Sequence, residues 1–232
     1  MIMLLPVYEP GHGLITTVTS LGDAAPGAHL VVVDDGSGPA SARVLRDAED
    51  LGCTVLRHDA NRGKGAALKT GLRHIAAEHP GRAVICADPD GQHRVEDILR
   101  VAEHVAVSGR MVLGVRRFEG RVPLRSRFGN AVTRLLFRAA TGCPVVDTQT
   151  GLRGYPAALL DWLCRVPGER FEYEMNVLLH AARSGVPIEQ TVIATTYLGD
   201  NGSSHFGSLK DSARVYRPLL RHALTPSARS RG

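Results

Sequence analysis

The sequence predicts a single α/β domain in which helices cover both faces of a mostly parallel sheet. Short apolar runs alternate along the chain with segments that carry apolar residues at helical spacing, and this alternation is typical of parallel strands joined by helical crossovers. The runs are continuously apolar, as expected for strands that are buried on both faces. A length of 232 residues suits one sizeable domain better than two.

The expected strands and helices follow one another from residue 2 onwards. The expected strands are the runs at residues 2–7, 30–33, 54–56, 82–87, 111–115 and 192–197. The expected helices begin near residues 12, 40, 61, 95, 126 and 171. In the helix near residue 61, for example, Leu68, Leu72 and Ile75 form an apolar stripe that would face the core. We expect the domain to extend over residues 1–208.

The last segment, residues 209–232, mixes basic and apolar residues before a polar end. We expect a basic helix there, interrupted at Pro218, followed by a disordered tail. The helix could lie on an anionic bilayer with Val215, Leu219 and Leu220 towards the lipid. It could equally be an ordinary terminal helix that docks on the domain.

Composition narrows the range of partners and compartments. The net charge of +5 and the pI near 9.3 favour anionic partners such as nucleotide phosphates, lipid phosphates or a membrane surface. Nucleic acid is the least favoured partner, because aromatic residues make up only 5% and do not alternate with basic ones. The four cysteines show no Cys-x-x-Cys spacing, which indicates reduced thiols in a cytoplasmic protein. We expect neither a signal peptide nor a membrane span.

Two acids, Asp88 and Asp90, follow the strand expected at residues 82–87. Alternate side chains of an extended segment face the same way, so both carboxylates can point out of the end of this strand. With the carbonyl of Gln92 they form a set of oxygen donors that suits Mg²⁺ or Mn²⁺ better than Zn²⁺. Gly91 would let the loop turn tightly enough to bring Gln92 back to the metal. An acidic turn without a metal is the alternative.

Other polar clusters are expected at the same edge of the sheet. Residues 6–9, 34–35 and 59–64 also follow the carboxyl ends of expected strands, where open α/β sheets bind their ligands. Together with the acid pair, these clusters favour a nucleotide site over a set of unrelated turns. The glycines on either side of Lys64 would let backbone N–H groups approach a phosphate, to which the lysine would add charge. A plain helix cap is the alternative at these glycines.

Residues 116–138 contain seven arginines, of which Arg116 and Arg127 flank the loop after the strand expected at residues 111–115. A guanidinium group binds phosphate through paired hydrogen bonds and stays charged. These two arginines would therefore suit a second phosphorylated reactant.

Two later segments add polar groups. Residues 147–153 form a polar loop between apolar residues and could enter the site. Glu172 and Glu174 open a helix, where the helix dipole favours carboxylates. A catalytic role is the other interpretation of these two acids.

Taken together, the motifs resemble the family 2 glycosyltransferases of the GT-A fold, and among them the dolichol-phosphate mannose and glucose synthase-like group. They occur in the family order at residues 6–9, 31–37, 61–72, 87–93, 113–116, 147–153, 171–179 and 197–211. The chain departs from the family pattern in two places. Glu9 and Pro10 stand where the family often has Asn-Glu, and Pro89 is the middle residue of the Asp-x-Asp motif.

The resemblance implies roles for residues on the donor side. The first loops would line the pocket for the base and ribose, and Asp88 would lie near the ribose and diphosphate. The expected donor-binding residues are Pro6, Tyr8, Glu9, Asp35, Lys64 and Asp88. The expected ligands of Mg²⁺ or Mn²⁺ are Asp88, Asp90 and Gln92.

The resemblance also implies roles on the acceptor side. Arg116 and Arg127 would hold the acceptor phosphate or the departing diphosphate, while residues 147–153 would shape the sugar and acceptor side. The expected acceptor-binding residues are Arg153, Ser204 and His205. The expected catalytic residues are Asp90, Arg116, Arg127 and Asp147.

The implied activity is an inverting transfer of a hexose from a nucleoside-diphosphate sugar, of the GDP-mannose or UDP-glucose type, to a polyprenyl phosphate. The acceptor oxygen is then already ionised, and membrane contact at the inner face is expected to weaken in high salt. A soluble sugar or natural-product hydroxyl is the alternative acceptor, and it would need Asp147 or Glu172 as a base. A sugar nucleotidyltransferase is disfavoured, because no Gly-rich activating loop with an arginine follows the first strand. A non-catalytic nucleotide-binding module is a third alternative, which full activity of Asp90→Ala would favour.

Overall fold

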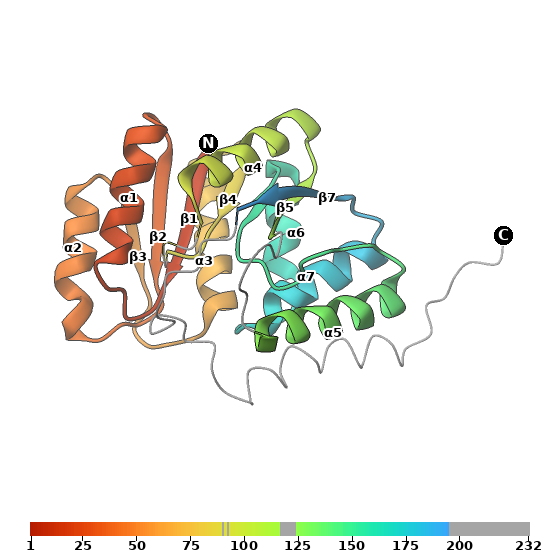
Figure 1. Ribbon diagram of the computed structural model, residues 1–232. Helices are drawn as coiled ribbons and strands as arrows, with labels where there is room; N and C mark the ends of the chain where they lie inside the picture. Colours follow the sequence, from red (N-terminus) through yellow and green to blue (C-terminus); the bar gives the residue numbers. More distant parts are fainter. Residues whose placement is uncertain (90, 92, 117–123, 195–232) are drawn as a thin grey trace.

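The computed structural model describes residues 1–89, 91, 93–116 and 124–194, with the side chains of residues 124–132 excepted. Seven strands form one sheet in the order β3-β2-β1-β4-β6-β5-β7 (Figure 1). All neighbouring strands are parallel except at β6, which is antiparallel to β4 and β5. The mostly parallel sheet predicted from the sequence is confirmed.

The bounds of the elements are as follows. The strands are β1 (Ile2–Val7), β2 (His29–Asp34), β3 (Thr54–Arg57), β4 (Val84–Cys86), β5 (Met111–Arg116), β6 (Arg153–Tyr155) and β7 (Ile188–Ile193). The α-helices are α1 (Gly13–Ala24), α2 (Ala42–Asp50), α3 (Lys64–Glu78), α4 (Val95–Ser108), α5 (Leu124–Thr141), α6 (Leu160–Arg165) and α7 (Glu172–Arg183). Two short 3₁₀ turns are η1 (Pro39–Ser41) and η2 (Ala157–Leu159).

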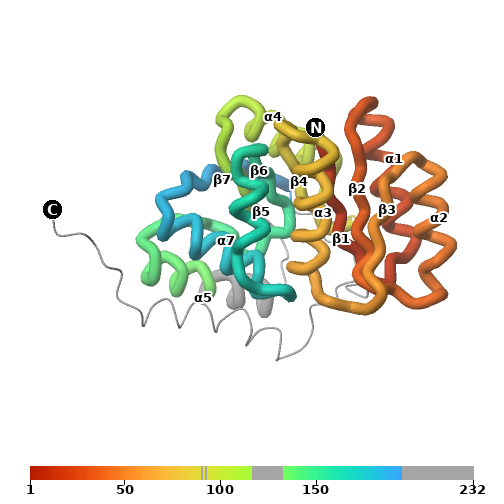
Figure 2. The backbone as a smooth tube through the Cα atoms, turned by 180° about the vertical axis from the view of Figure 1, so that it is seen from behind, coloured from red at the N-terminus to blue at the C-terminus, as the bar shows by residue number. Residues whose placement is uncertain are grey.

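Helices cover both faces of the sheet, as the sequence predicts. Every residue of β1 is buried, and its side chains alternate between two cores because successive residues of a strand face opposite sides. Met3 and Leu5 pack with apolar residues of α1, α2 and α4. Ile2 and Leu4 pack with those of α3, α6 and α7. Figure 2, which views the molecule from behind, shows α3 on the face opposite α1.

Three elements near the C-terminal side differ from the prediction, and one of them is the short helix α6, which was not predicted. The last strand, β7, runs over Ile188–Ile193 and pairs with β5 along its whole length. It begins four residues before the predicted start, and residues 195–197 of the prediction lie outside the described ranges. The prediction missed its beginning because Glu189 and Gln190 interrupt the apolar run. Strand β6 was not predicted at all, since Arg-Gly-Tyr gives no apolar run. Its insertion brings the loop before Arg153 to the carboxyl ends of β4 and β5.

The predicted terminal segment, residues 209–232, lies outside the described part of the chain. Of the helices that the structure describes, none is both long enough and apolar enough to cross a bilayer.

Candidate functional site

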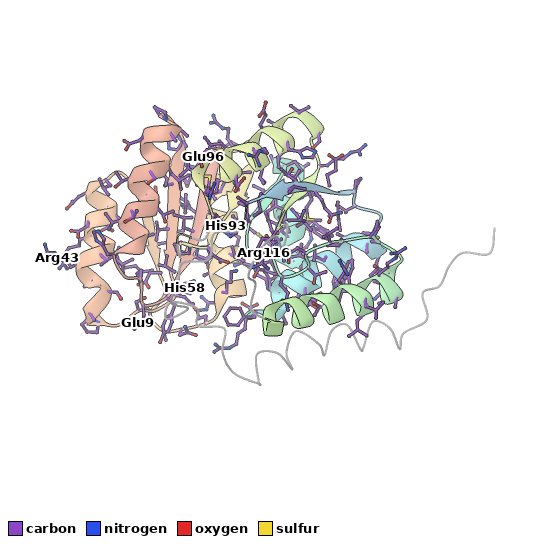
Figure 3. The ribbon with its side chains drawn as sticks, in the orientation of Figure 1. Glu9, Arg43, His58, His93, Glu96 and Arg116 are labelled. Atoms are coloured by element: carbon purple, nitrogen blue, oxygen red, sulfur yellow. The ribbon has the colours of Figure 1, made fainter. Side chains whose placement is uncertain are left out.

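The carboxyl ends of the parallel strands share one edge of the sheet, and polar residues of several loops follow the strands at this edge. Glu9, His58 and His93 follow β1, β3 and β4, while Arg116 ends β5 (Figure 3). This edge is where ligands bind in open α/β sheets. The site can therefore be described strand by strand.

At the end of β1, Glu9 connects two loops. Its carboxylate accepts hydrogen bonds from Gly38 N at 2.8 Å and from the Ser41 hydroxyl at 3.1 Å, while its own N–H donates to Ser37 Oγ at 2.8 Å. The backbone of Glu9 is in the left-handed region, with φ of 49°. Glu9 thus connects the loop after β1 to the loop after β2 by hydrogen bonds.

The other predicted residues of the base and ribose pocket differ in exposure. Pro6 is buried within β1, whereas Tyr8 is 39% exposed after the end of the strand. Tyr8 therefore offers an aromatic face at the edge of the sheet. Pro6 can act only through the backbone path that it imposes on the strand end.

After β2, Asp35 organises the loop that leads into α3. Its carboxylate accepts hydrogen bonds from the N–H groups of Arg62 and Gly63 at 2.9 and 2.7 Å. The same carboxylate lies 2.8 Å from His58 Nδ1, and His58 Nε2 lies 3.0 Å from Thr70 Oγ1. Asp35 is only 3% exposed, so its main interactions are with the protein. His58 was not singled out from the sequence, although it directly follows a strand.

The glycines around Lys64 have a packing role. A Cβ at Gly65 would lie 2.6 Å from the Cβ of Tyr173, and one at Gly63 would lie 2.5 Å from the carbonyl oxygen of Glu169. Ala66 N donates to the same Glu169 carbonyl at 2.8 Å. The chain that precedes α7 therefore covers the start of α3, and the N–H groups of Gly63 and Ala66 have partners within the protein.

Lys64 lies between two carboxylates. Its ammonium group is 2.8 Å from Asp88 Oδ1 and 2.8 Å from Glu174 Oε2. Burial lowers the pKa of Lys64, but the two carboxylates outweigh it and raise the pKa above its ordinary value. For Asp88 the order is similar: burial raises the pKa of the carboxyl, whereas Lys64, His93 and Arg153 lower it below its ordinary value. Both groups are therefore charged at neutral pH.

The Asp88 side chain packs directly against the loop before β6. A Cβ on Gly151 would collide with Oδ2 of the Asp88 carboxylate, so only glycine fits at this position without displacing the acid. The side chain of Asp88 is still 32% exposed. One carboxylate oxygen thus faces Lys64, and the other packs against the Gly151 backbone.

Asp147 and Arg116 form a second ion pair at the end of β5. Arg116 donates from Nε to Asp147 Oδ2 at 2.7 Å and from Nη2 to Oδ1 at 3.2 Å. Asp147 is completely buried, whereas the Arg116 side chain is 25% exposed. Asp147 therefore orients the arginine, and its burial does not fit the alternative prediction of a general base.

Arg153 differs from its predicted role. It is 1% exposed, and it donates to the carbonyl oxygens of Thr148, Thr150 and Glu174 at 3.3, 3.0 and 2.8 Å. Such burial does not fit a direct contact with an acceptor. The reason is its place in β6, which turns the side chain inward to hold the loop that carries Gly151.

The two acids at the start of α7 have separate partners. Glu172 Oε1 accepts hydrogen bonds from the N–H groups of Glu169 and Arg170 at 3.1 and 3.2 Å, so it holds the turn before α7 and does not cap the N–H groups of the helix. Glu174 instead reaches Lys64 and, at 3.5 Å, Arg153 Nε. The sequence left a catalytic role open for both acids but did not indicate that Glu174 would pair with Lys64. A signal for different roles was available, because residues two apart on a helix point in nearly opposite directions and cannot both cap it.

The remaining predicted residues lie beyond what the structure describes. Asp90, Gln92, Ser204 and His205 are outside the described ranges, and only the backbone of Arg127 is described, within α5. Asp88 alone therefore represents the predicted metal ligands. Its ionised, partly exposed carboxylate is a donor that suits a hard cation. Among the described residues no group of three His, Cys, Asp or Glu side chains could hold a metal, so further oxygens would have to complete the site.

Comparison with known proteins gives consistent results. The model of the family "Glycosyl transferase family 2" matches residues 3–159. The UDP-N-acetylglucosamine–dolichyl-phosphate N-acetylglucosaminyltransferase of Methanococcus voltae is 25% identical over 84% of this chain and 85% of its own length. The undecaprenyl-phosphate mannosyltransferase of Micrococcus luteus is 28% identical over 82% of this chain and 81% of its own length.

A similar fold occurs in a solved structure. Glucosyl-3-phosphoglycerate synthase from Mycobacterium tuberculosis, crystallised with Mn²⁺, UDP and glucosyl-3-phosphoglycerate, superimposes with a TM-score of 0.72. The superposition covers 98% of this chain and 81% of that chain, at 18% identity. The likeness therefore concerns the fold.

Proposed function

Because the chain belongs to glycosyl transferase family 2, we propose that it transfers a hexose from a nucleoside-diphosphate sugar to a polyprenyl phosphate, with inversion at the anomeric carbon. Membership of the family confirms the resemblance seen in the sequence. The names of the two relatives, which act on dolichyl and undecaprenyl phosphates, support the class of acceptor. The transfer screen described below would identify the sugar and the base of the donor.

One observation carries the choice of acceptor. On the described part of the edge, the acids that could serve as a base are paired or buried: Asp147 pairs with Arg116 and Glu174 with Lys64. Glu172 binds backbone N–H groups through Oε1, and its Oε2 is buried. A hydroxyl acceptor would need one of them free to take a proton. A phosphate oxygen carries its negative charge at neutral pH and needs no such base.

The donor would occupy the β1–β4 side of the edge. Tyr8, Glu9 and Asp35 would border the base and ribose, and Lys64 would face the diphosphate. Asp88, with Asp90 and Gln92, would hold Mg²⁺ or Mn²⁺. When bound, the ion neutralises the charge that develops on the leaving diphosphate.

The acceptor would approach from the β5 side. Arg116, oriented by the buried carboxylate of Asp147, would bind the acceptor phosphate, with Arg127, Ser204 and His205 as further candidates. An oxygen of this phosphate would attack the anomeric carbon and form the new C–O bond. The bond to the diphosphate breaks on the opposite face, and its electron pair leaves with the diphosphate. No proton is transferred, and a fixed cation at each phosphate lowers the barrier.

Peripheral contact with a membrane would follow from a lipid acceptor. On α5, Leu135 is exposed beside the exposed Arg134 and Arg138. An apolar side chain between basic ones is the composition that binds an anionic bilayer surface. Co-sedimentation with anionic vesicles that weakens in high salt would test this contact.

A transfer screen tests the proposed function. GDP-mannose, UDP-glucose and UDP-N-acetylglucosamine are each incubated with a short polyprenyl phosphate and with Mn²⁺ or Mg²⁺. We expect one of the donors to give a metal-dependent glycolipid, and Asp88→Ala to give none. A donor that binds with metal but yields no lipid product in any combination would contradict the lipid acceptor and favour a soluble hydroxyl.

A further inference from the structure

The position of Lys64 between Asp88 and Glu174 suggests that it changes partners when metal and donor bind. We propose that the Lys64 ammonium holds the place of the divalent ion on Asp88, and that Glu174 retains the lysine in the site when metal and donor displace it. The inference rests on the proposed function and deepens it, since it assigns an exchange of partners to residues of the donor site.

The first step of the argument concerns the oxygen that the lysine uses. Lys64 Nζ lies 2.8 Å from Oδ1 of Asp88. The other oxygen, Oδ2, packs against the backbone of Gly151, where even a Cβ would collide with it. Oδ1 is the oxygen that lies further from this backbone, and it is the one that Lys64 already binds.

The second step is electrostatic. A divalent ion binds a carboxylate oxygen at roughly 2.1 Å, so an ion and an ammonium group on the same oxygen would be close neighbours of like charge. Their repulsion is strong at such separations, even with the screening that a partly exposed site provides. One cation must therefore displace the other from Asp88.

The third step concerns what holds Lys64 after it leaves Asp88. Glu174 Oε2 is 2.8 Å from the ammonium group, and Glu174 Oε1 is 3.5 Å from the Nε of Arg153. Arg153 is fixed by its hydrogen bonds to three carbonyl oxygens. Glu174 is thus a fixed partner, whereas Lys64 is the first residue of α3 and has a flexible four-carbon stem. The released ammonium group can turn to the diphosphate without leaving the site.

This exchange predicts opposite effects on two ligands. If Lys64 competes with the metal, its removal strengthens metal binding in the absence of nucleotide. If it then binds the diphosphate, its removal weakens nucleotide binding in the presence of metal. If Lys64 only supported the structure, its removal would lower the affinities for both metal and nucleotide, because Asp88 and Glu174 would be misplaced.

The experiment compares the Mn²⁺ affinity of the full wild-type chain with that of two variants of the full chain. Binding is measured by electron paramagnetic resonance without nucleotide. We expect Lys64→Met to bind Mn²⁺ at least about tenfold more tightly than the wild type. The control is Arg62→Met, which removes one charge from an exposed side chain two residues away and should change the affinity by no more than about twofold. With saturating Mn²⁺, we expect Lys64→Met to bind UDP or GDP, whichever the wild type binds, about tenfold more weakly.

Glu174→Gln tests the retaining role separately. It keeps an acceptor for Lys64 and Arg153 but loses the charge, so we expect weaker nucleotide binding without any gain in Mn²⁺ affinity. Thermal unfolding checks that each variant is folded. Should Lys64→Met fail to fold, Lys64→Gln, which retains a hydrogen-bond donor, takes its place in the same titrations.

The results separate the inference from the proposed function. Mn²⁺ affinity that is unchanged or lower in the Lys64 variant, or raised equally in Arg62→Met, overturns the exchange. The absence of Mn²⁺ binding in every protein overturns both the exchange and the metal site. The expected shifts without any sugar transfer by the wild type uphold the exchange and contradict the proposed function.

Discussion

The two sides of the site edge use their carboxylates in different ways. On the β1–β2 side, Glu9 and Asp35 accept hydrogen bonds mainly from backbone N–H groups of neighbouring loops, and their side-chain partners are Ser41 and His58. On the β4–β5 side, Asp88, Glu174 and Asp147 pair with the cationic side chains of lysine and arginine. Acids that look equivalent in the sequence therefore belong to two kinds of structure.

The difference indicates what each side can recognise. A backbone N–H is fixed by the path of its loop, so the β1–β2 side forms a rigid wall that suits the uncharged base and ribose. A lysine or arginine can exchange a carboxylate for a phosphate of similar charge and geometry. Substitutions on the first side should therefore act mainly on donor binding and loop stability, and those on the second side mainly on the transfer step.

The largest effect is expected for Asp147→Ala. Removing one partner of a buried ion pair costs about 3 kcal/mol of unfolding free energy, and the freed Arg116 would lose its orientation. If Arg116 holds the acceptor phosphate, the rate of transfer should fall about a hundredfold, measured as kcat at saturating donor. The thermal midpoint of unfolding reports the loss of stability.

The matched control for Asp147→Ala is Glu189→Ala, at the amino end of the same β5–β7 strand pair. Glu189 also pairs with an arginine, Arg110, at 2.9 Å, and with His104. Its loss should lower the unfolding temperature but leave kcat unchanged. Equal losses of kcat in both variants would show that Asp147 acts through stability alone.

The next effect is expected for Gly151→Ala. The added methyl group would displace the Asp88 carboxylate, and misplacing a reacting group by about an ångström can cost a hundredfold in rate. We expect Mn²⁺-dependent nucleotide binding to fall at least about tenfold, measured by titration calorimetry.

The control for Gly151→Ala is Gly22→Ala, in α1, where a Cβ meets nothing within 4 Å. This change should raise the stability slightly, because alanine favours a helix by about 1 kcal/mol over glycine, and it should leave nucleotide binding unchanged. Normal nucleotide binding by Gly151→Ala would mean that the function of Asp88 does not depend on its packing against Gly151.

The contrast between the two sides also explains how much could be predicted from the sequence. The elements from β1 to α4 were predictable because their strands are continuous apolar runs and their helices carry regular stripes. The position of Asp88 at the site edge was predictable as well, because it follows a strand and because the carboxyl ends of parallel strands share one edge. Both inferences use only neighbouring residues.

The remaining features depend on contacts between distant parts of the chain. Lys64 meets Glu174 only after α3 and α7 have packed on the same face of the sheet. The burial of Asp147 and Arg153 likewise follows from β6, a strand of three residues without an apolar run. A sequence pattern identifies such residues as polar, but only the fold decides whether they face a ligand or another side chain.

A smaller effect on the rate is expected for Asp35→Asn. The amide keeps one acceptor but places a donor against the N–H of Arg62 or Gly63, which should cost about 1–3 kcal/mol of unfolding free energy. We expect the KM for the donor to rise about tenfold while kcat stays within about twofold. A fall in kcat as large as that of Asp147→Ala would erase the distinction between the two sides.

The smallest effect is expected for Glu9→Gln. Glutamine retains one oxygen that can accept the hydrogen bond of Gly38 N, and the hydrogen bonds of Glu9 lie at the exposed surface. The unfolding free energy should therefore fall by only about 0.5 kcal/mol, and the KM for the donor should rise about twofold. A tenfold or greater rise in KM without loss of stability would mean that the Glu9 carboxylate binds the nucleoside directly. The β1–β2 side would then contribute charge to recognition as well as shape.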